Sequence, residues 1–296
     1  MSLLSGILVV DKPAGFTSHD VVAKMRGILR ERRIGHAGTL DPMATGVLPL
    51  FIGAATKAVP FLPGEKSYAA DFILGMTTDT QDSTGRTLSV SDVRPGLEEM
   101  CAGLEGFRGE IWQTPPMMSA VKVGGVRLYR YARQGIEVER QPRRVIVSAL
   151  TLDEPAPGTF TLCVTCSAGF YVRTLIHDLG QVWGCGAVMT GLRRLCAGPY
   201  TLEEAHTLED ISGAKESGRL EALLIPLDSL FSELPCVMLD THEEIKWRNG
   251  MAVMLPEERF VPRVRVYAPG GRFLSVGVME RVDSGARLRT EKNFFG

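Results

Sequence analysis

The chain has 296 residues, of which 45% are hydrophobic and 23% charged, and its formal net charge is −1. This composition is typical of a globular protein with one large domain, or with a large domain and a small one. No stretch reaches the roughly 18 uninterrupted apolar residues of a membrane helix, and the N-terminus lacks the basic flank, apolar run and cleavage site of a secretory signal. We therefore expect a soluble, cytoplasmic protein that makes no membrane contact.

The first expected elements are a short strand, a turn and a helix. Residues Gly6 to Val10 are an apolar run that ends at Asp11-Lys12-Pro13-Ala14-Gly15, a sequence typical of a turn. Thr17 or Ser18 is placed to cap a helix that runs from about His19 to Glu31.

The next segment, residues 35–48 (GHAGTLDPMATGVL), places one carboxylate, Asp41, among glycines, a proline and two threonines. Glycine relieves the steric limits on the backbone and lets a ligand approach the main chain, while Pro42 fixes the backbone angle just after Asp41. A stiff turn therefore presents the carboxylate. From these residues alone, Asp41 is either a working acid or a residue that bonds its own backbone or caps a helix starting at Pro42.

The middle of the chain mixes strand and helix patterns. Alternation predicts strands at Lys66 to Gly75 and at Phe160 to Ser167. The connector from Thr77 to Gly85 has part of a calcium-loop pattern, but the third acid spacing and the closing glutamate are missing, so we interpret it as a turn. Helical patterns cover four segments: Leu97 to Leu104, Tyr129 to Gly135, Arg173 to Val182, and the acidic stretch from Leu202 to Leu224.

Six cysteines are scattered along a chain without a secretory signal, so we expect reduced, mostly buried thiols rather than a disulfide framework. Cys163 and Cys166 have the spacing of a metal-binding pair, but residues three apart in an alternating strand point to opposite faces. A second pair at ligand spacing is missing, and the five histidines form no cluster. The sequence therefore predicts no metal site.

Charge is distributed unevenly. Between Lys122 and Arg144, in an irregular segment that begins at Pro115-Pro116, there are seven basic residues and two acidic ones. A second basic cluster immediately precedes the Asp41 loop: Lys24, Arg26, Arg30, Arg32 and Arg33. A solvated helix face explains one such run by itself, but two clusters, one beside a candidate catalytic loop, favour contact with a phosphate backbone.

The end of the chain differs from the rest. Residues Pro226 to Pro235 have the composition of a linker, and from Cys236 onward glycines alternate with short apolar runs such as Val264 to Tyr267 and Phe273 to Val278. We therefore expect a large domain over residues 1–231, with a basic insertion at about 116–145, and a small β-rich domain over residues 235–296.

Eight segments, in order along nearly the whole chain, resemble the bacterial tRNA pseudouridine synthase B family. They are residues 6–15, 35–48, 66–68, 78–85, 113–122, 128–135, 166–175 and 191–194. The resemblance implies a mixed α/β catalytic domain with a largely antiparallel central sheet, followed by a PUA-like RNA-binding domain that includes Arg263 to Tyr267. It also implies isomerisation of uridine to pseudouridine in the T-loop of tRNA, at position 55, by base flipping.

The resemblance assigns three catalytic residues. Asp41 is the nucleophile, which attacks the sugar or the base or stabilises the separated intermediate, and the sequence does not choose between these. Tyr68 stacks on the flipped uracil with its hydroxyl near C5. Arg173 pairs with Asp41, and we expect the guanidinium to lower the pKa of that carboxyl and keep it ionised.

The resemblance also assigns substrate-binding residues. Tyr171, expected on the same strand face as Arg173, lines the base pocket, and Leu192 forms its apolar side. His36 fills the space that the flipped nucleotide leaves. Lys12 and Lys122 lie near the active site or the RNA. The implied partner is tRNA, bound at its T-loop and acceptor stem region, and no cofactor, metal or obligatory protein partner is implied.

Two other classes of function are compatible with parts of the sequence. One is a non-catalytic RNA-binding protein or tRNA folding factor on the same fold, although the combination of Asp41, Tyr68 and Arg173 favours an enzyme. The other is a glycoside hydrolase, which also attacks a sugar C1′ but normally needs two carboxylates flanking the bond. Asp41 has no acidic neighbour within its motif, so this alternative is disfavoured.

Overall fold

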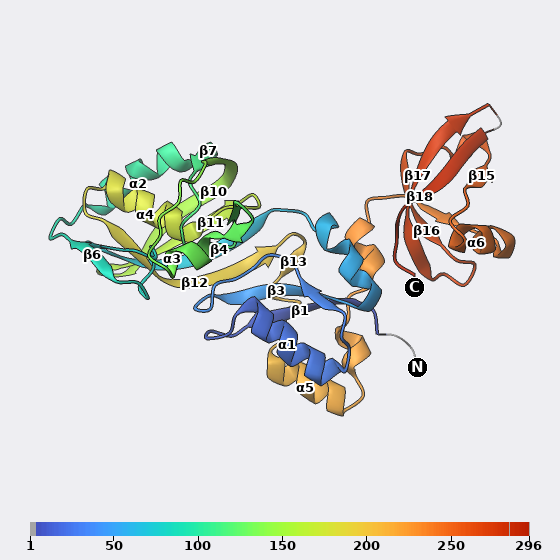
Figure 1. The fold of residues 1–296 in the computed structure, drawn as a ribbon, viewed down its shortest axis with the longest axis horizontal. Helices are drawn as coiled ribbons and strands as arrows, with labels where there is room; N and C mark the ends of the chain where they lie inside the picture. Colours follow the sequence, from blue (N-terminus) through green and yellow to red (C-terminus); the bar gives the residue numbers. More distant parts are fainter. Residues whose placement is uncertain (1–3, 284, 296) are drawn as a thin grey trace.

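The computed structural model describes residues 4–283 and 285–295. Residues 1–3 and 296 of the two expected domains, together with position 284, lie outside the described residues. One large nine-stranded sheet and one five-stranded sheet organise the chain, with helices packed against both (Figure 1). The predicted mixed α/β fold is therefore confirmed.

The central sheet carries the residues of interest. Its strands follow the order β1-β3-β12-β4-β11-β10-β7, with β2 and β13 added beside β3 and β12. Their bounds are Gly6–Lys12 (β1), Ile34–His36 (β2), Thr45–Ile52 (β3), Lys66–Leu74 (β4), Gly109–Gln113 (β7), Arg143–Ala156 (β10), Thr159–Cys166 (β11), Ala187–Ala197 (β12) and Tyr200–Thr201 (β13). Every pairing is antiparallel except that of β12 with β3. The expected strands at Lys66 to Gly75 and Phe160 to Ser167 correspond to β4 and β11, which are direct neighbours.

The first helix, α1 (Ser18–Leu29), begins where the sequence predicts. Thr17 is the N-cap, and its hydroxyl accepts from the backbone of Asp20 at 3.0 Å. The helix stops two residues before the predicted end because Arg30 adopts a left-handed conformation with φ 54°. Apolar side chains of α1 and α5 (Leu208–Glu216) pack together against β1 and β3, and both helices lie on that side of the sheet (Figure 1).

In the other half of the sheet, α4 (Val172–Val182), with α2 (Leu97–Gly103) beside it, packs on the hydrophobic cluster of β4, β10 and β11. Smaller elements complete the large unit: β5 (Met76–Thr78), β6 (Thr87–Val90), β8 (Lys122–Val123), β9 (Val126–Arg127) and α3 (Leu128–Ala132). The helix expected over Tyr129 to Gly135 is thus only one turn and a half long, because a left-handed Gly135 follows it closely.

One sequence-based assignment near the end of the large unit is wrong. The acidic segment from Leu202 to Leu224 is not one helix, since only α5 and a short 3₁₀ turn over Leu220–Leu223 are helical. The expected linker contains a 3₁₀ turn, Leu227–Phe231, whose two end residues are buried in a hydrophobic cluster. Burial of Phe231 makes this segment part of the packed structure rather than a free connection.

The C-terminal unit is a five-stranded sheet in the order β14-β16-β17-β18-β15. Its elements are β14 (Cys236–Met238), α6 (Thr241–Arg248), β15 (Val253–Leu255), β16 (Arg263–Tyr267), β17 (Phe273–Val282) and β18 (Gly285–Asn293). The glycine-rich alternation predicts the strands but not α6, which begins with a capping box at Asp240.

Aromatic packing joins the two units. The rings of Phe61 and Phe231 lie edge to face at 5.4 Å, and Phe294 from the C-terminal unit contacts Phe231 at 5.7 Å between centroids. The Tyr267 hydroxyl donates to Asp228 at 2.8 Å across the same junction. Such contacts hold the small unit in a defined position beside the large one (Figure 1).

The cysteines are all free, in line with the expected absence of a disulfide framework. The expectation that most of them are buried is wrong: Cys166 and Cys185 are buried, Cys163 and Cys196 are half-buried, and Cys101 and Cys236 are exposed. Within residues 4–283 and 285–295, no cluster of three or more His, Cys, Asp or Glu side chains suits a metal ion. In the same part of the chain, no helix is both long and apolar enough to span a membrane.

Candidate active site

Asp41 lies in the loop that joins β2 to β3, and backbone contacts hold this loop from both sides. The Leu40 amide donates to the Ser18 hydroxyl of α1 at 2.9 Å, and the Gly15 amide donates to the Pro42 carbonyl at 2.9 Å. No helix begins at Pro42, since residues 42 and 43 form a turn and β3 starts at Thr45. The interpretation of Asp41 as a helix cap is therefore excluded.

The predicted pairing of Asp41 with Arg173 is present. Arg173 Nε lies 3.0 Å from Asp41 Oδ2, and Nη2 donates to Oδ1 at 3.3 Å, so the contact is bidentate. The guanidinium is 5% exposed and the carboxylate is 36% exposed. The arginine therefore lies beneath the carboxylate and orients it towards the open side.

Arg173 has further partners, which the sequence analysis missed. Its Nη1 donates to the Thr80 carbonyl at 3.0 Å and lies 3.5 Å from Asp82 Oδ2, while Nη2 donates to the Met118 carbonyl at 3.0 Å. We call this group, Arg173 with Asp41, Asp82, Thr80 and Met118, the Asp41 cradle. Every nitrogen of the buried guanidinium thus has an acceptor.

Asp82 is a buried carboxylate, not merely part of a turn. It is 6% exposed, and its Oδ1 accepts from the Thr80 and Thr84 hydroxyls. The one signal in the sequence is a threonine two residues before and two residues after the acid, which suits local side-chain bonding. Because its oxygens are engaged by Thr80, Thr84 and Arg173, Asp82 does not serve as the second catalytic acid that a glycoside hydrolase needs.

The electrostatics of Asp41 differ from the expectation. The pKa of Asp41 is raised, because burial disfavours the charged form more than the Arg173 guanidinium favours it, and the nearby Asp82 charge adds to the rise. The arginine does lower this pKa, as predicted, but the net shift is upward, so the predicted direction is wrong. Desolvation decides the sign, and it is invisible in a linear sequence.

Tyr68 lies on β4 and is only 8% exposed. It belongs to the hydrophobic cluster that also contains Leu40 and Ala44 of the Asp41 loop, with Leu192 packed at the edge. Leu192 on β12 pairs with Ala70, two residues after Tyr68, so both side chains lie on one face of the sheet. The structure therefore brings Tyr68, Leu192 and the Asp41 loop together.

Tyr171 is placed differently from the expectation. It is the N-cap of α4, and Arg173 is in the first turn of that helix, so the two residues do not share a strand face. Gln113 of β7 holds the Tyr171 backbone, accepting from its amide at 2.8 Å and donating to its carbonyl at 3.0 Å. The helix start, rather than strand alternation, sets the position of both side chains.

Lys12 and His36 flank the loop. Lys12 is fully buried, and its ammonium donates to the carbonyls of Pro13, Phe16 and Pro42, which supports the loop from below. Burial lowers the pKa of Lys12 to about 8. His36, at the end of β2, is half-buried, and burial also lowers its pKa. A contact of either residue with RNA stays a prediction.

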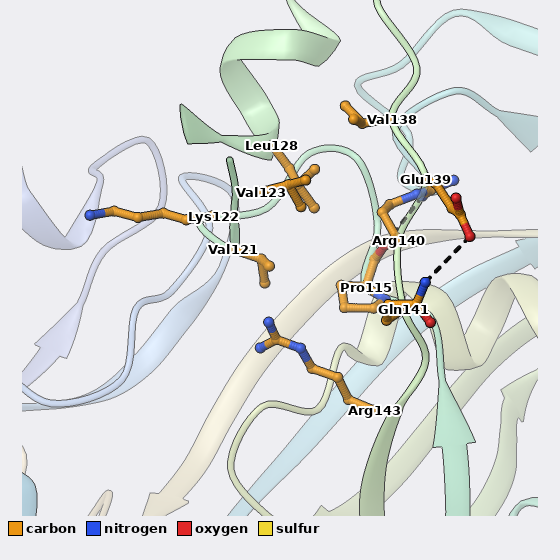
Figure 2. Close-up of a pocket in the computed structure, with 10 residues that line it drawn as sticks. All are labelled: Pro115, Val121, Lys122, Val123, Leu128, Val138, Glu139, Arg140, Gln141 and Arg143. Carbon is orange, nitrogen blue, oxygen red and sulfur yellow. Dashed lines mark hydrogen bonds between the residues drawn. The ribbon is translucent and has the colours of Figure 1, made fainter. Parts of the chain in front are cut away.

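The basic arm, defined as residues 116–145, is built from short elements and loops. A cavity of about 470 Å³ lies at its base and includes Lys122, Arg140 and Arg143 in its lining. Arg140 donates to the Pro115 carbonyl at 3.2 Å, whereas the Lys122 ammonium points away from the other lining side chains (Figure 2). Lys122 is exposed, and its contact with the active site or the RNA stays a prediction.

Comparison with solved structures defines the class of the fold. The crystal structure of a Cbf5-Nop10-Gar1 complex matches with a TM-score of 0.71 and 26% identity, over 98% of this chain and 85% of that chain. An H/ACA RNP bound to a substrate RNA containing 2′-deoxyuridine matches with a TM-score of 0.71 and 25% identity over the same shares. The fold is that of the pseudouridine synthases.

Sequence comparison defines the family. Residues 26–172 match the N-terminal domain of the TruB family of pseudouridylate synthases, and residues 173–232 match the tRNA pseudouridylate synthase B C-terminal domain. A tRNA pseudouridine synthase B of Pseudomonas aeruginosa is 44% identical over 278 residues, which is 93% of this chain and 91% of the relative. One of Heliobacterium mobile is 44% identical over 267 residues, covering 88% and 85%. The chain belongs to the TruB family.

Proposed function

We propose that this protein isomerises uridine to pseudouridine in tRNA, with the T-loop uridine at position 55 as its target. The observation that carries the proposal is the Asp41 cradle: a partly exposed carboxylate held by a buried arginine in a synthase fold. Family membership and the names of the relatives support it. An enzyme of this kind works where tRNA is present, which is the cytoplasm.

The reaction breaks the bond between ribose C1′ and N1 of the base, turns the base, and rejoins it through C5. Nothing is oxidised and no group is donated, so side chains suffice. In this proposal Asp41 attacks the sugar or the base, or stabilises the separated intermediate. Arg173 keeps the carboxylate in position while the bond breaks.

The flipped uracil is received by Tyr68, with its hydroxyl near C5, and by Leu192 and Tyr171. Burial of Tyr68 in the cluster below the Asp41 loop supports this role, because it leaves the ring rigid beside the carboxylate. His36 fills the space that the base leaves. Extraction of a base from folded RNA costs a few kcal/mol, which these contacts offset.

Binding is assigned to the basic arm and to the C-terminal sheet. Exposed arginines of the arm contact phosphates, and Lys122 contacts the RNA as well. The C-terminal unit, residues 235–296, acts as a PUA-like module on the acceptor stem region. No cofactor, metal or additional protein is required by this scheme.

The test is tritium release from C5-labelled uridine in a full-length tRNA transcript. Wild-type protein is expected to release tritium, and Asp41→Asn is expected to lose turnover while it still binds tRNA. Asp92→Asn, at an exposed aspartate that is not a member of the cradle, is the matched control and is expected to keep wild-type release. A transcript with cytidine at the T-loop target is expected to give no release.

Either of two results would contradict the proposal. Tight, salt-sensitive binding without release from any uridine leaves a non-catalytic RNA-binding protein. Equal release from the transcript that lacks the T-loop uridine moves the target elsewhere in the RNA.

A further inference from the structure

Arg194, on β12, is a buried arginine to which the proposed chemistry assigns no role. Its side chain is fully buried, its Nε donates to the Val47 carbonyl at 2.7 Å, and its Nη2 donates to the Gly38 carbonyl at 3.0 Å. The side chain thus reaches residues on both sides of Asp41. Its Nη1 has no hydrogen-bond partner among the described residues. An unpaired buried nitrogen is costly, so it requires an explanation.

The Asp41 loop approaches Arg194 at two glycines. A Cβ atom on Gly46 would lie 2.2 Å from the Arg194 carbonyl oxygen, and one on Gly38 would lie 3.0 Å from Nη1. Both glycines also have positive φ angles. Two glycines of the motif therefore make room for this arginine rather than for the substrate.

Tyr68 is the direct neighbour of Arg194 on the adjacent strand. The antiparallel register of β4 and β12 pairs Tyr68 directly with Arg194, which puts the two side chains on one face of the sheet. Burial raises the pKa of Tyr68, and the Arg194 guanidinium beside it opposes that rise.

Charged and titratable groups face Tyr68 from three elements: Arg194 from β12, Cys166 from β11 and Asp41 from its loop. Burial raises the pKa of the Cys166 thiol to about 12, so this thiol stays neutral at ordinary pH. A charged Asp41 raises the pKa of Tyr68 further. Among these three groups, Arg194 is the one that favours the phenolate form of Tyr68.

We propose that Arg194 is a positioning residue for the second half of the reaction, in which its Nη1 holds the Tyr68 oxygen and stabilises the phenolate that removes the C5 proton. This inference rests on the proposed function. After C1′ has joined C5, the phenolate takes the C5 proton and the C–H electron pair becomes the C5=C6 double bond. The C6=N1 pair moves onto N1, which takes a proton from water, and Tyr68 later releases its proton to solvent.

The test measures single-turnover pseudouridine formation against pH, in tRNA that carries protium or deuterium at C5 of the target uridine, for Arg194→Gln and wild type. The glutamine variant is expected to lose rate near neutral pH, roughly tenfold for each unit by which the Tyr68 pKa rises. The lost rate returns as pH is raised, and the isotope effect at C5 grows because proton removal becomes the slow step. Arg193→Gln is the matched control, since Arg193 belongs to the opposite face and pairs with Asp11 at 2.8 Å.

A loss by the same factor at every pH, without a larger isotope effect, would overturn the inference and leave Arg194 as a support of the loop. Because the glutamine variant removes two backbone contacts, Arg194→Lys is the second variant. It is expected to lose part of the rate, and difluorotyrosine at position 68, a more acidic phenol, is expected to restore it. An unimpaired lysine variant, or no rescue, contradicts the inference. Absence of pseudouridine formation by the wild type contradicts the proposed function instead.

Discussion

The Asp41 cradle and the basic arm use the same type of residue in opposite ways. Arg173 in the cradle is 5% exposed and has four different acceptor groups around it. Arg127, Arg130 and Arg133 in the arm are exposed to solvent. A buried cation is oriented and alters the pKa values of its neighbours, whereas an exposed cation exchanges its counterions for phosphates. The comparison teaches that the proposed chemistry and the proposed binding call for arginines in opposite environments, one buried and one exposed.

The two regions nevertheless meet at one point. The carbonyl of Met118, near the start of the arm, accepts from Arg173 at 3.0 Å. A movement of the arm on RNA binding would therefore change a hydrogen bond of Arg173, the arginine that holds Asp41.

The largest expected effect comes from breaking the cradle. Arg173→Met leaves two carboxylates, Asp41 and Asp82, without their shared cation, and loss of one partner of a buried pair costs about 3–5 kcal/mol. We expect a loss of that size in unfolding free energy, measured by denaturant titration, and a fall in tritium release of at least about a hundredfold. Affinity for tRNA is expected to change little, and a large loss of binding with normal turnover at saturation would contradict the separation of the two regions.

A smaller effect is expected from the arm. The triple variant Arg127→Gln, Arg130→Gln, Arg133→Gln should weaken tRNA binding and reduce the slope of log K against log salt by roughly 0.7 to 0.9 for each phosphate contact that is lost. Turnover at saturating tRNA should stay near the wild-type value. Lys215→Gln, an exposed cation in the acidic segment, is the matched control. An unchanged salt slope would show that these three arginines make no phosphate contacts in the complex with tRNA.

The smallest effect is a shift in pH dependence. The Asp82 charge raises the pKa of Asp41, so Asp82→Asn should lower that pKa and move the acid limb of the rate profile to lower pH. The wild-type limb should lie above the ordinary aspartate value of 3.8, because burial raises the pKa of Asp41. The measurement is single-turnover release as pH is lowered. A limb that moves to higher pH would mean that Asp82 acts on Asp41 mainly by holding Arg173.

The sequence by itself determined the local features. Thr17 and its capping box, the alternation of β4 and β11, and the stiff glycine and proline turn around Asp41 all depend on residues near one another in the chain. The family resemblance added Arg173 as the partner of Asp41, 132 residues away, and the structure has that pair. Propensity and spacing suffice for such features because backbone conformation is decided mostly by neighbouring residues.

Only the tertiary structure decided the rest. The sheet order brings β12 between β3 and β4, which places Arg194 against both Tyr68 and the Asp41 loop. Chain crossings place Asp82, 91 residues from Arg173, in the cradle. The physical reason is desolvation: whether Arg173 or burial sets the pKa of Asp41 depends on how many atoms exclude water from the carboxylate. That count exists only after the strands have packed.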